Sequence, residues 1–173
     1  DGVSIHFIHQ KSKVPNAKTI LLLNGWPSSI AEYEKVIGPL TDPVAHGGHA
    51  EDAFNVVIPA MPGFGFSDKP REPGFHPERI ANMWVALMAR LGYTRYAVHG
   101  SDWGGGIATR IALNDPTHVF ALHLAACGGA PAAGNQPPPP AVTVDKTVNA
   151  AHRSEEHTFE LQSRFGISYA VFC

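Results

Sequence analysis

The sequence is poor in cysteine, in charge and in long apolar runs. Of 173 residues only two are cysteines, too few for a disulfide framework, and neither stands at metal-ligand spacing from the ten histidines. The formal net charge is -2, so there is no basic excess to bind the phosphates of nucleic acid or of an anionic membrane. We therefore expect no metal site, no nucleic-acid partner and no visible membrane association.

Two patterns that direct a protein to a membrane or out of the cell are not visible in these residues. No apolar run approaches the roughly 20 residues of a membrane-spanning helix, and no signal peptide opens the sequence. These absences predict a soluble chain. The first residue is Asp1 rather than Met, which points to an upstream segment and leaves the localisation unknown, with the cytoplasm as a guess.

Short apolar runs alternate with stretches of helical periodicity. Strand patterns occur at residues 3–9, 18–23, 54–58, 96–99 and 119–124, and helical spacing occurs at 30–37, 80–91 and 107–113. The dense apolar runs are typical of strands buried on both faces, which belong to parallel sheets. The alternation predicts an α/β fold, with a mainly parallel sheet covered by helices on both faces.

The composition changes towards the C-terminal end. Residues 137–152 open with four consecutive prolines, which neither pair well in a sheet nor continue a helix, so we interpret them as a linker. Residues 153–173 begin Arg-Ser-Glu-Glu-His-Thr and end Ile-Ser-Tyr-Ala-Val-Phe-Cys. Both stretches resemble the conceptual translation of a sequencing-library adapter, and the alternative is a genuine short amphipathic tail.

Residues 96–106, Tyr-Ala-Val-His-Gly-Ser-Asp-Trp-Gly-Gly-Gly, predict a strand that enters a helix through a sharp turn. In a nucleophile elbow the reactive side chain lies on a strained turn, and the residues two before and two after it must be small. Gly100 and Gly104 flank Asp102 at this spacing. The residues that flank Ser101 in the same way are a histidine and a tryptophan, which are too large. The elbow therefore presents a carboxylate.

Other interpretations of these residues stay open. Asp102 is also suited to cap the helix that begins at Trp103, a common role for aspartate. A dinucleotide-binding turn is disfavoured, because the glycines miss the required spacing and no acidic residue ends the next strand. His118 and His123 lie too close behind the elbow for either to be its general base.

A carboxylate nucleophile restricts the chemistry. Aspartate has an ordinary pKa of about 3.9, so it is ionised at neutral pH and needs no activating base. It can displace a leaving group at saturated carbon, and an activated water then hydrolyses the resulting enzyme ester. The oxyanion of that second step needs backbone N–H donors, which we expect from Trp103 and from Trp26 in the loop after residues 18–23.

Three motifs, in this order, resemble those of the epoxide hydrolases of the α/β-hydrolase superfamily, nearest the microsomal and juvenile-hormone branch. They are Asn24-Gly25-Trp26-Pro27, Pro62-Gly63-Phe64-Gly65-Phe66-Ser67-Asp68-Lys69-Pro70 and Gly100-Ser101-Asp102-Trp103-Gly104. The resemblance implies that Asp102 is the nucleophile and that Trp103 and Trp26 supply the oxyanion-hole amides. Loop and elbow geometry is then set by four further residues: Gly25, Pro27, Gly100 and Gly104.

The resemblance also implies finer features of the first motif. The peptide bond before Pro27 would be cis, a conformation open to X-Pro bonds. Asn24 stands where the family usually has histidine. Asparagine can still hydrogen-bond locally, and this departure bears on the geometry of the loop.

The implied function is the hydrolysis of a small-molecule epoxide by water to a vicinal diol, through an aspartyl ester and without a cofactor. The family's triad acid, histidine and cap tyrosines lie further along the chain. Residues 1–136 are thus interpreted as the N-terminal part of an α/β-hydrolase core truncated before the cap domain, 137–152 as the Pro-rich linker and start of the missing cap, and 153–173 as the adapter-derived tail. We expect this fragment to be inactive by itself.

Two alternatives to an epoxide hydrolase remain. A haloalkane dehalogenase shares the aspartate nucleophile and the tryptophan that follows it. A non-catalytic or non-folding α/β fragment is the other, because missing later strands would leave a hydrophobic sheet edge exposed.

Overall fold

The computed structural model describes residues 2–125 and the two strands Thr158–Gln162 and Ser168–Phe172. The Pro-rich linker and both cysteines lie outside the described residues. In the part of the chain that is described, no helix is both long enough and apolar enough to cross a bilayer. The division of the chain into segments 1–136, 137–152 and 153–173 stays a prediction.

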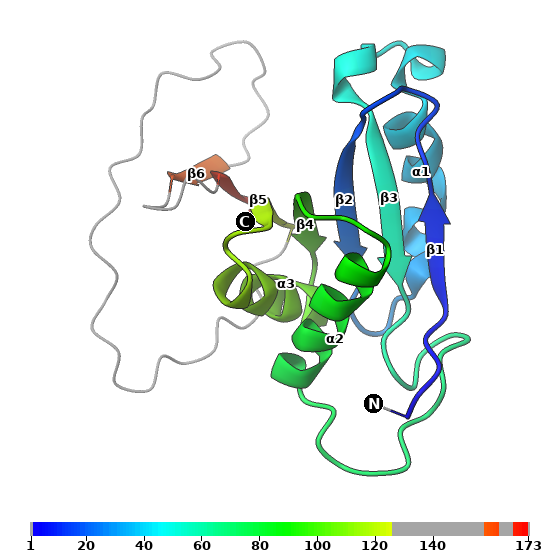
Figure 1. Ribbon diagram of the computed structural model, residues 1–173, viewed down its shortest axis with the longest axis vertical. Helices are drawn as coiled ribbons and strands as arrows, with labels where there is room; N and C mark the ends of the chain where they lie inside the picture. Colours follow the sequence, from blue (N-terminus) through cyan, green and yellow to red (C-terminus); the bar gives the residue numbers. More distant parts are fainter. Residues whose placement is uncertain (1, 126–157, 163–167, 173) are drawn as a thin grey trace.

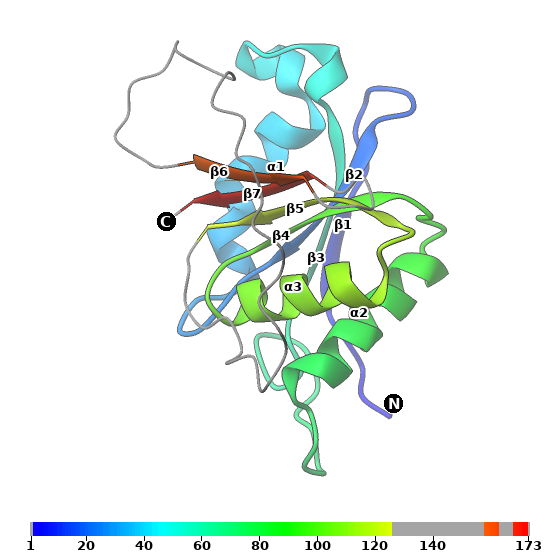
Figure 2. The same ribbon diagram turned by 90° about the vertical axis from the view of Figure 1, so that its left-hand side faces the viewer.

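Within the described residues, seven strands form one sheet in the order β1-β3-β2-β4-β5-β7-β6. Figure 1 shows the strands β1 to β4, and Figure 2 adds β7 between β5 and β6. They are β1 (Phe7–Gln10), β2 (Lys18–Leu23), β3 (Phe54–Pro59), β4 (Tyr96–Gly100), β5 (Val119–Leu124), β6 (Thr158–Gln162) and β7 (Ser168–Phe172). The pairs from β3 through β2, β4 and β5 to β7 are parallel, and β1 and β6 pair antiparallel at the two edges. The predicted mainly parallel sheet is confirmed.

Helices cover both faces of this sheet, as predicted (Figure 2). They are α1 (Glu34–Thr41), α2 (Pro77–Arg90) and α3 (Trp103–Asn114), with short 3₁₀ turns at Ile30–Tyr33, Pro43–His46 and Ala50–Asp52. Helix α1 lies on one face, and α2 and α3 lie side by side on the other. The turn before α1 is capped by Ser29, whose side chain accepts a hydrogen bond from the Ala31 N–H.

The apolar core lies on both faces of the central strands. In β2 the side chains of Leu21 and Leu23 join the cluster under α2 and α3, while Leu22 joins the cluster under α1. This division follows from the two-residue side-chain period of a strand. Trp84 of α2 is 1% exposed. Strand β2 is thus buried on both faces, as its dense apolar sequence predicted.

The first strand is shorter than predicted. The pattern at residues 3–9 predicted a strand, but β1 begins only at Phe7. The preceding segment pairs with the loop after β3 instead. The Asp68 N–H donates to the Ser4 carbonyl oxygen, and the Ala60 N–H donates to the His6 carbonyl oxygen, each at 2.9 Å. Alternation alone does not identify which backbone a segment will pair with.

The edge of the sheet at β5 also differs from the prediction. Missing strands were expected to leave this edge open, but β7 pairs with β5 in parallel, with Leu122 opposite Tyr169. An edge strand presents unpaired N–H and C=O groups, and an extended segment of sufficient length satisfies them.

Candidate active site

The chain bends sharply at Asp102, between β4 and α3. Asp102 has φ 51° and ψ −122°, a backbone conformation that residues other than glycine rarely adopt. Such strain costs on the order of 1–3 kcal/mol and persists only where the surrounding structure holds it. The bend lies at the carboxyl end of a parallel strand, the edge at which open α/β sheets bind ligands. The Asp102 side chain is exposed there.

Two glycines allow the strand and the helix to approach each other. A Cβ atom on Gly100 would lie 2.3 Å from the carbonyl oxygen of Gly104, and a Cβ on Gly104 would lie 2.1 Å from the carbonyl oxygen of Leu23. Real Cβ atoms do not come this close to backbone. The spacing rule that selected Asp102 rather than Ser101 therefore corresponds to an actual close approach.

The Asp102 carboxylate is bound by the loop after β2. The backbone N–H of Trp26 donates a hydrogen bond to Oδ1 of Asp102 at 2.9 Å. The same side chain makes no capping hydrogen bond to the first turn of α3. Asp102 therefore occupies the N-cap position of α3, but its side chain binds the loop after β2 and not the helix.

The geometry of this loop depends on Gly25 and its neighbours. A Cβ on Gly25 would lie 2.4 Å from both Cβ and Oδ1 of Asp102. The peptide bond between Trp26 and Pro27 is cis, as the resemblance implied. Asn24 is 2% exposed, and its Nδ2 donates to the Gly25 carbonyl oxygen at 3.1 Å. The asparagine thus makes the local hydrogen bond that was expected of it.

Trp103 is the first residue of α3 and follows Asp102 directly. Amides in the first turn of a helix have no acceptor within the helix. The Trp103 N–H is therefore a donor without an acceptor inside the helix, and it belongs to the residue next to Asp102 in the sequence. The Trp26 and Trp103 side chains are 66% and 56% exposed.

A group of side chains that the sequence did not predict to meet lies beside the bend, on the α1 side of the sheet. The Nδ1 atoms of His99 and His123 are 2.7 Å apart, within hydrogen-bond distance. Burial, with a smaller contribution from His123, lowers the pKa of His99 to about 4. The ring of Tyr33 contacts His99 edge-on, and burial raises the pKa of its hydroxyl. The sequence did contain a signal for this contact, because His99 and His123 each stand at, or one residue before, the end of a predicted strand.

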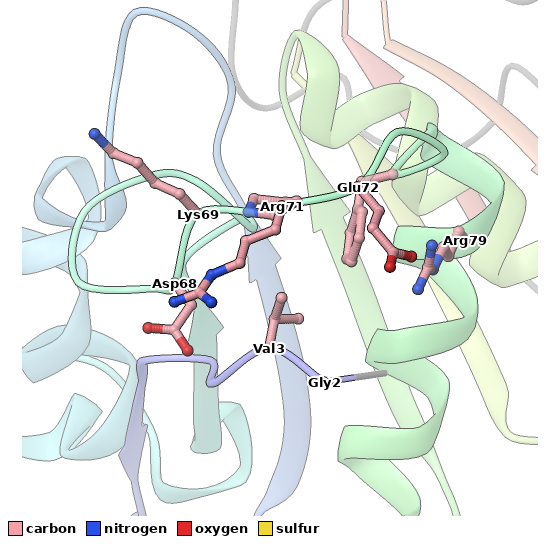
Figure 3. A pocket seen from close by; sticks show the side chains of 9 residues that line it. Gly2, Val3, Asp68, Lys69, Arg71, Glu72 and Arg79 are labelled. Atoms are coloured by element: carbon pink, nitrogen blue, oxygen red, sulfur yellow. The ribbon is translucent and has the colours of Figure 1, made fainter.

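A separate cavity of about 740 Å³ lies beside the N-terminal segment. In Figure 3 the Arg71 side chain extends towards Asp68, and Lys69 from the same loop points away from them. Glu72 and Arg79 point towards each other on the other side. Charges of both signs therefore line it. None of the residues around the bend contributes to its lining, so this cavity is distinct from the candidate active site.

Comparison with known families agrees with this geometry. A family model described as the alpha/beta hydrolase fold matches residues 18–155, and a model described as the epoxide hydrolase N terminus matches residues 1–33. The resemblance to epoxide hydrolases drawn from the three motifs is confirmed.

Curated relatives of the chain are named epoxide hydrolases. A protein of Stigmatella aurantiaca assigned as an epoxide hydrolase is 53% identical over 124 residues, which cover 72% of this chain and 28% of the relative. Epoxide hydrolase 1 of Oryctolagus cuniculus is 41% identical over 128 residues, with the same coverage. The chain thus spans 28% of the length of each of these relatives.

Solved structures support the fold. The juvenile hormone epoxide hydrolase of the silkworm Bombyx mori matches with a TM-score of 0.63 and 37% identity, over 72% of this chain and 33% of that one. The Aspergillus niger epoxide hydrolase matches with a TM-score of 0.64 and 28% identity, over 79% of this chain and 35% of that one.

Proposed function

The chain belongs to the α/β hydrolase fold family, and we propose that the complete protein is an epoxide hydrolase that acts through an ester on Asp102. The observation that carries the proposal is the strained bend at Asp102, where one carboxylate oxygen accepts the Trp26 N–H. The similarity to epoxide hydrolases over the same residues supports it.

In the first step the Asp102 carboxylate attacks one carbon of the epoxide ring. The new bond joins a carboxylate oxygen to that carbon, and the bond from the same carbon to the epoxide oxygen breaks. The released alkoxide takes a proton, which the resemblance assigns to the cap tyrosines. Asp102 is already ionised at neutral pH, so no base is needed to activate it.

In the second step water hydrolyses the ester. The resemblance assigns the general base to a histidine further along the complete protein. This histidine takes a proton from water, and the hydroxide adds to the carboxyl carbon of Asp102. The negative charge then develops on the oxygen that accepts the Trp26 N–H, and we assign the Trp103 N–H as its second donor. Losing one such donor typically slows a reaction on the order of a hundred- to a thousand-fold. Collapse of this intermediate breaks the bond between the carboxyl carbon and the ester oxygen and regenerates the Asp102 carboxylate. The departing alkoxide takes the proton that the histidine holds, and the diol is released.

We expect the chain by itself to be inactive. It holds the nucleophile and both proposed amide donors, but the second step needs a base. His118 pairs with Asp115 at 2.5 Å at the far end of β5, and His123 pairs with His99 beneath the sheet edge. These contacts agree with the expectation that neither is the base. The comparisons favour neither a haloalkane dehalogenase nor a non-catalytic fragment.

Isotope labelling of the complete protein tests the covalent route. In a single turnover in heavy-oxygen water, the label should enter the Asp102 carboxylate, because water attacks the ester carbonyl rather than the substrate. Mass spectrometry of the peptide that contains Asp102 detects it. Label in the diol and none in Asp102 would sink the proposed route.

Substitution of the carboxylate supplies the matched control. Asp102→Asn removes the anionic nucleophile and should abolish diol formation. Asp52→Asn makes the same chemical change at an exposed position in the 3₁₀ turn Ala50–Asp52 and should leave the rate unchanged. Equal rates for the two variants would contradict the assignment of Asp102.

A further inference from the structure

The carboxyl ends of β4 and β5 carry a pair of histidines on the face opposite α3. The strand register places His99 directly opposite His123. Their Nδ1 atoms are 2.7 Å apart, and the ring centroids are 4.8 Å apart with an angle of 26° between the planes. A hydrogen bond between two neutral imidazoles needs one donor and one acceptor. One ring therefore carries its proton on Nδ1 and the other carries it on Nε2.

Burial keeps this pair uncharged at neutral pH. It lowers the pKa of His99 to about 4, and it also lowers the pKa of His123. The titratable groups that face His99 are His123 from β5 and Glu32 and Tyr33 from the turn before α1. Glu32 acts in the opposite direction and raises the pKa of His99, but burial outweighs it.

Tyr33 connects the pair to the bend. Its ring meets the His99 ring edge-on, with centroids 5.8 Å apart, and the residue is 6% exposed. Its hydroxyl has no hydrogen bond of ordinary geometry to the described residues, and its polar neighbours include the Ser101 side chain. Ser101 immediately precedes Asp102. Packed side chains thus run without interruption from β5 to the residue before the bend.

We propose that His99 and His123 form a positioning pair that holds the bend at Asp102 through Tyr33 and Ser101. The close glycine contacts hold the bend from the side of α3. On the side of α1, the hydrogen bond between the imidazoles links β4 to β5 at the base of the bend. A strained backbone persists only where several such constraints act together. The pair touches no reacting atom, and its role rests on the proposed function.

Kinetics of the complete protein test this role. His123→Leu removes the hydrogen bond but keeps a side chain of similar volume, whereas His123→Asn keeps an amide that can donate or accept. We expect His123→Leu to lower kcat about tenfold, because a misplacement near 1 Å can cost about a hundredfold. KM should change by less than about twofold, since substrate contacts remain. His123→Asn should restore most of kcat.

A histidine at the other end of β5 provides the control. His118 is hydrogen-bonded to Asp115 at the opposite end of β5. His118→Leu therefore removes a histidine hydrogen bond of similar kind, far from the bend. It should lower Tm and leave kcat unchanged.

Two further measurements on the same proteins do not depend on catalytic activity. Nitrogen NMR of the histidines should show one ring protonated on Nδ1 and one on Nε2 for the pair. Hydrogen exchange of the Trp26 amide, which is bound to Asp102, should be about tenfold faster in His123→Leu and unchanged in His118→Leu. If the wild type hydrolyses no epoxide, the proposed function fails, and amide exchange still decides the positioning role.

Two results would overturn the inference. One is a His123→Leu variant with a lower Tm but with wild-type kcat and Trp26 exchange, which would make the pair part of the core and nothing more. The other is a spectrum in which both rings carry the proton on Nε2, because the hydrogen bond between the Nδ1 atoms would then be absent.

Discussion

The Trp26 amide binds Oδ1 of Asp102 at 2.9 Å across a separation of 76 residues in the sequence. Within residues 2–125 the structure gives Oδ2 no hydrogen bond, so Oδ2 is the oxygen we assign as the attacking atom. The donor is a backbone group, so changing the Trp26 side chain does not remove it. The donor is lost only when the loop moves, and the residues that set the loop are therefore the ones to change.

Gly25→Ala should inactivate the complete protein. The added Cβ would lie 2.4 Å from two atoms of Asp102, so either the loop or the carboxylate must shift. We expect kcat/KM for epoxide hydrolysis to fall at least about a hundredfold, the cost of a misplacement near 1 Å. Initial rates measure this, and circular dichroism checks that the variant is folded. A folded variant with the wild-type rate would contradict the close approach.

Two glycines of α3 should respond to alanine in opposite ways. A Cβ on Gly104 meets the Leu23 backbone, whereas a Cβ on Gly106 meets only the end of the Arg110 side chain, at 3.8 Å. Gly104→Ala should lower the free energy of unfolding by about 3 kcal/mol through overpacking. Gly106→Ala should raise it by about 0.5–1 kcal/mol, because alanine favours the helix.

Urea denaturation of the two variants, measured side by side, checks this prediction. The expected order of stability is Gly106→Ala, then wild type, then Gly104→Ala. A Gly104→Ala protein as stable as the wild type would mean that the strand and the helix do not touch at the bend.

Stability should fall below neutral pH because of His99. Its pKa in the folded protein is lowered to about 4 from 6.5, so the unfolded chain takes up the proton first. The contribution of neutral His99 to the free energy of unfolding is therefore fully present above about pH 6.5, and it is lost as the pH falls towards 4. At about 1.4 kcal/mol per pKa unit, its upper limit is about 3 kcal/mol.

Unfolding free energies of the complete protein between about pH 7 and pH 4.5 measure this loss. His99→Asn removes the titrating group and should give a shallower slope over the same range. Equal slopes for the two proteins would assign the acid sensitivity to other groups.

Asn24 should stabilise the folded protein through the hydrogen bond that its side-chain amide donates. Its buried Nδ2 donates to the Gly25 carbonyl oxygen, and Asn24→Ala removes that bond at a cost of about 1 kcal/mol in unfolding free energy. Asn24→Asp keeps the shape but places a carboxylate against a carbonyl oxygen, which should cost more. Thermal unfolding compares the two. If Asn24→Asp proved the more stable variant, the donor role would be wrong.

Local patterns predicted much of this fold. The strands at residues 18–23 and 119–124 have the predicted bounds, because dense apolar runs bounded by polar residues fix a buried strand locally. The glycines around Asp102 predicted the bend, because the requirement for small residues acts over only two positions on either side. The prediction of a strand at residues 3–9 was wrong for its first half, where the backbone forms hydrogen bonds with a loop about 60 residues away.

The amino-acid sequence alone determined where strands and helices form and which residue stands on the sharp turn, since periodicity, apolar density and glycine spacing act within a few residues. Only the tertiary structure decided that Asp102 turns its oxygen to Trp26 and that His99 meets His123. Both contacts depend on the order and register of strands in the sheet, and these are set by the packing of segments that lie far apart in the chain.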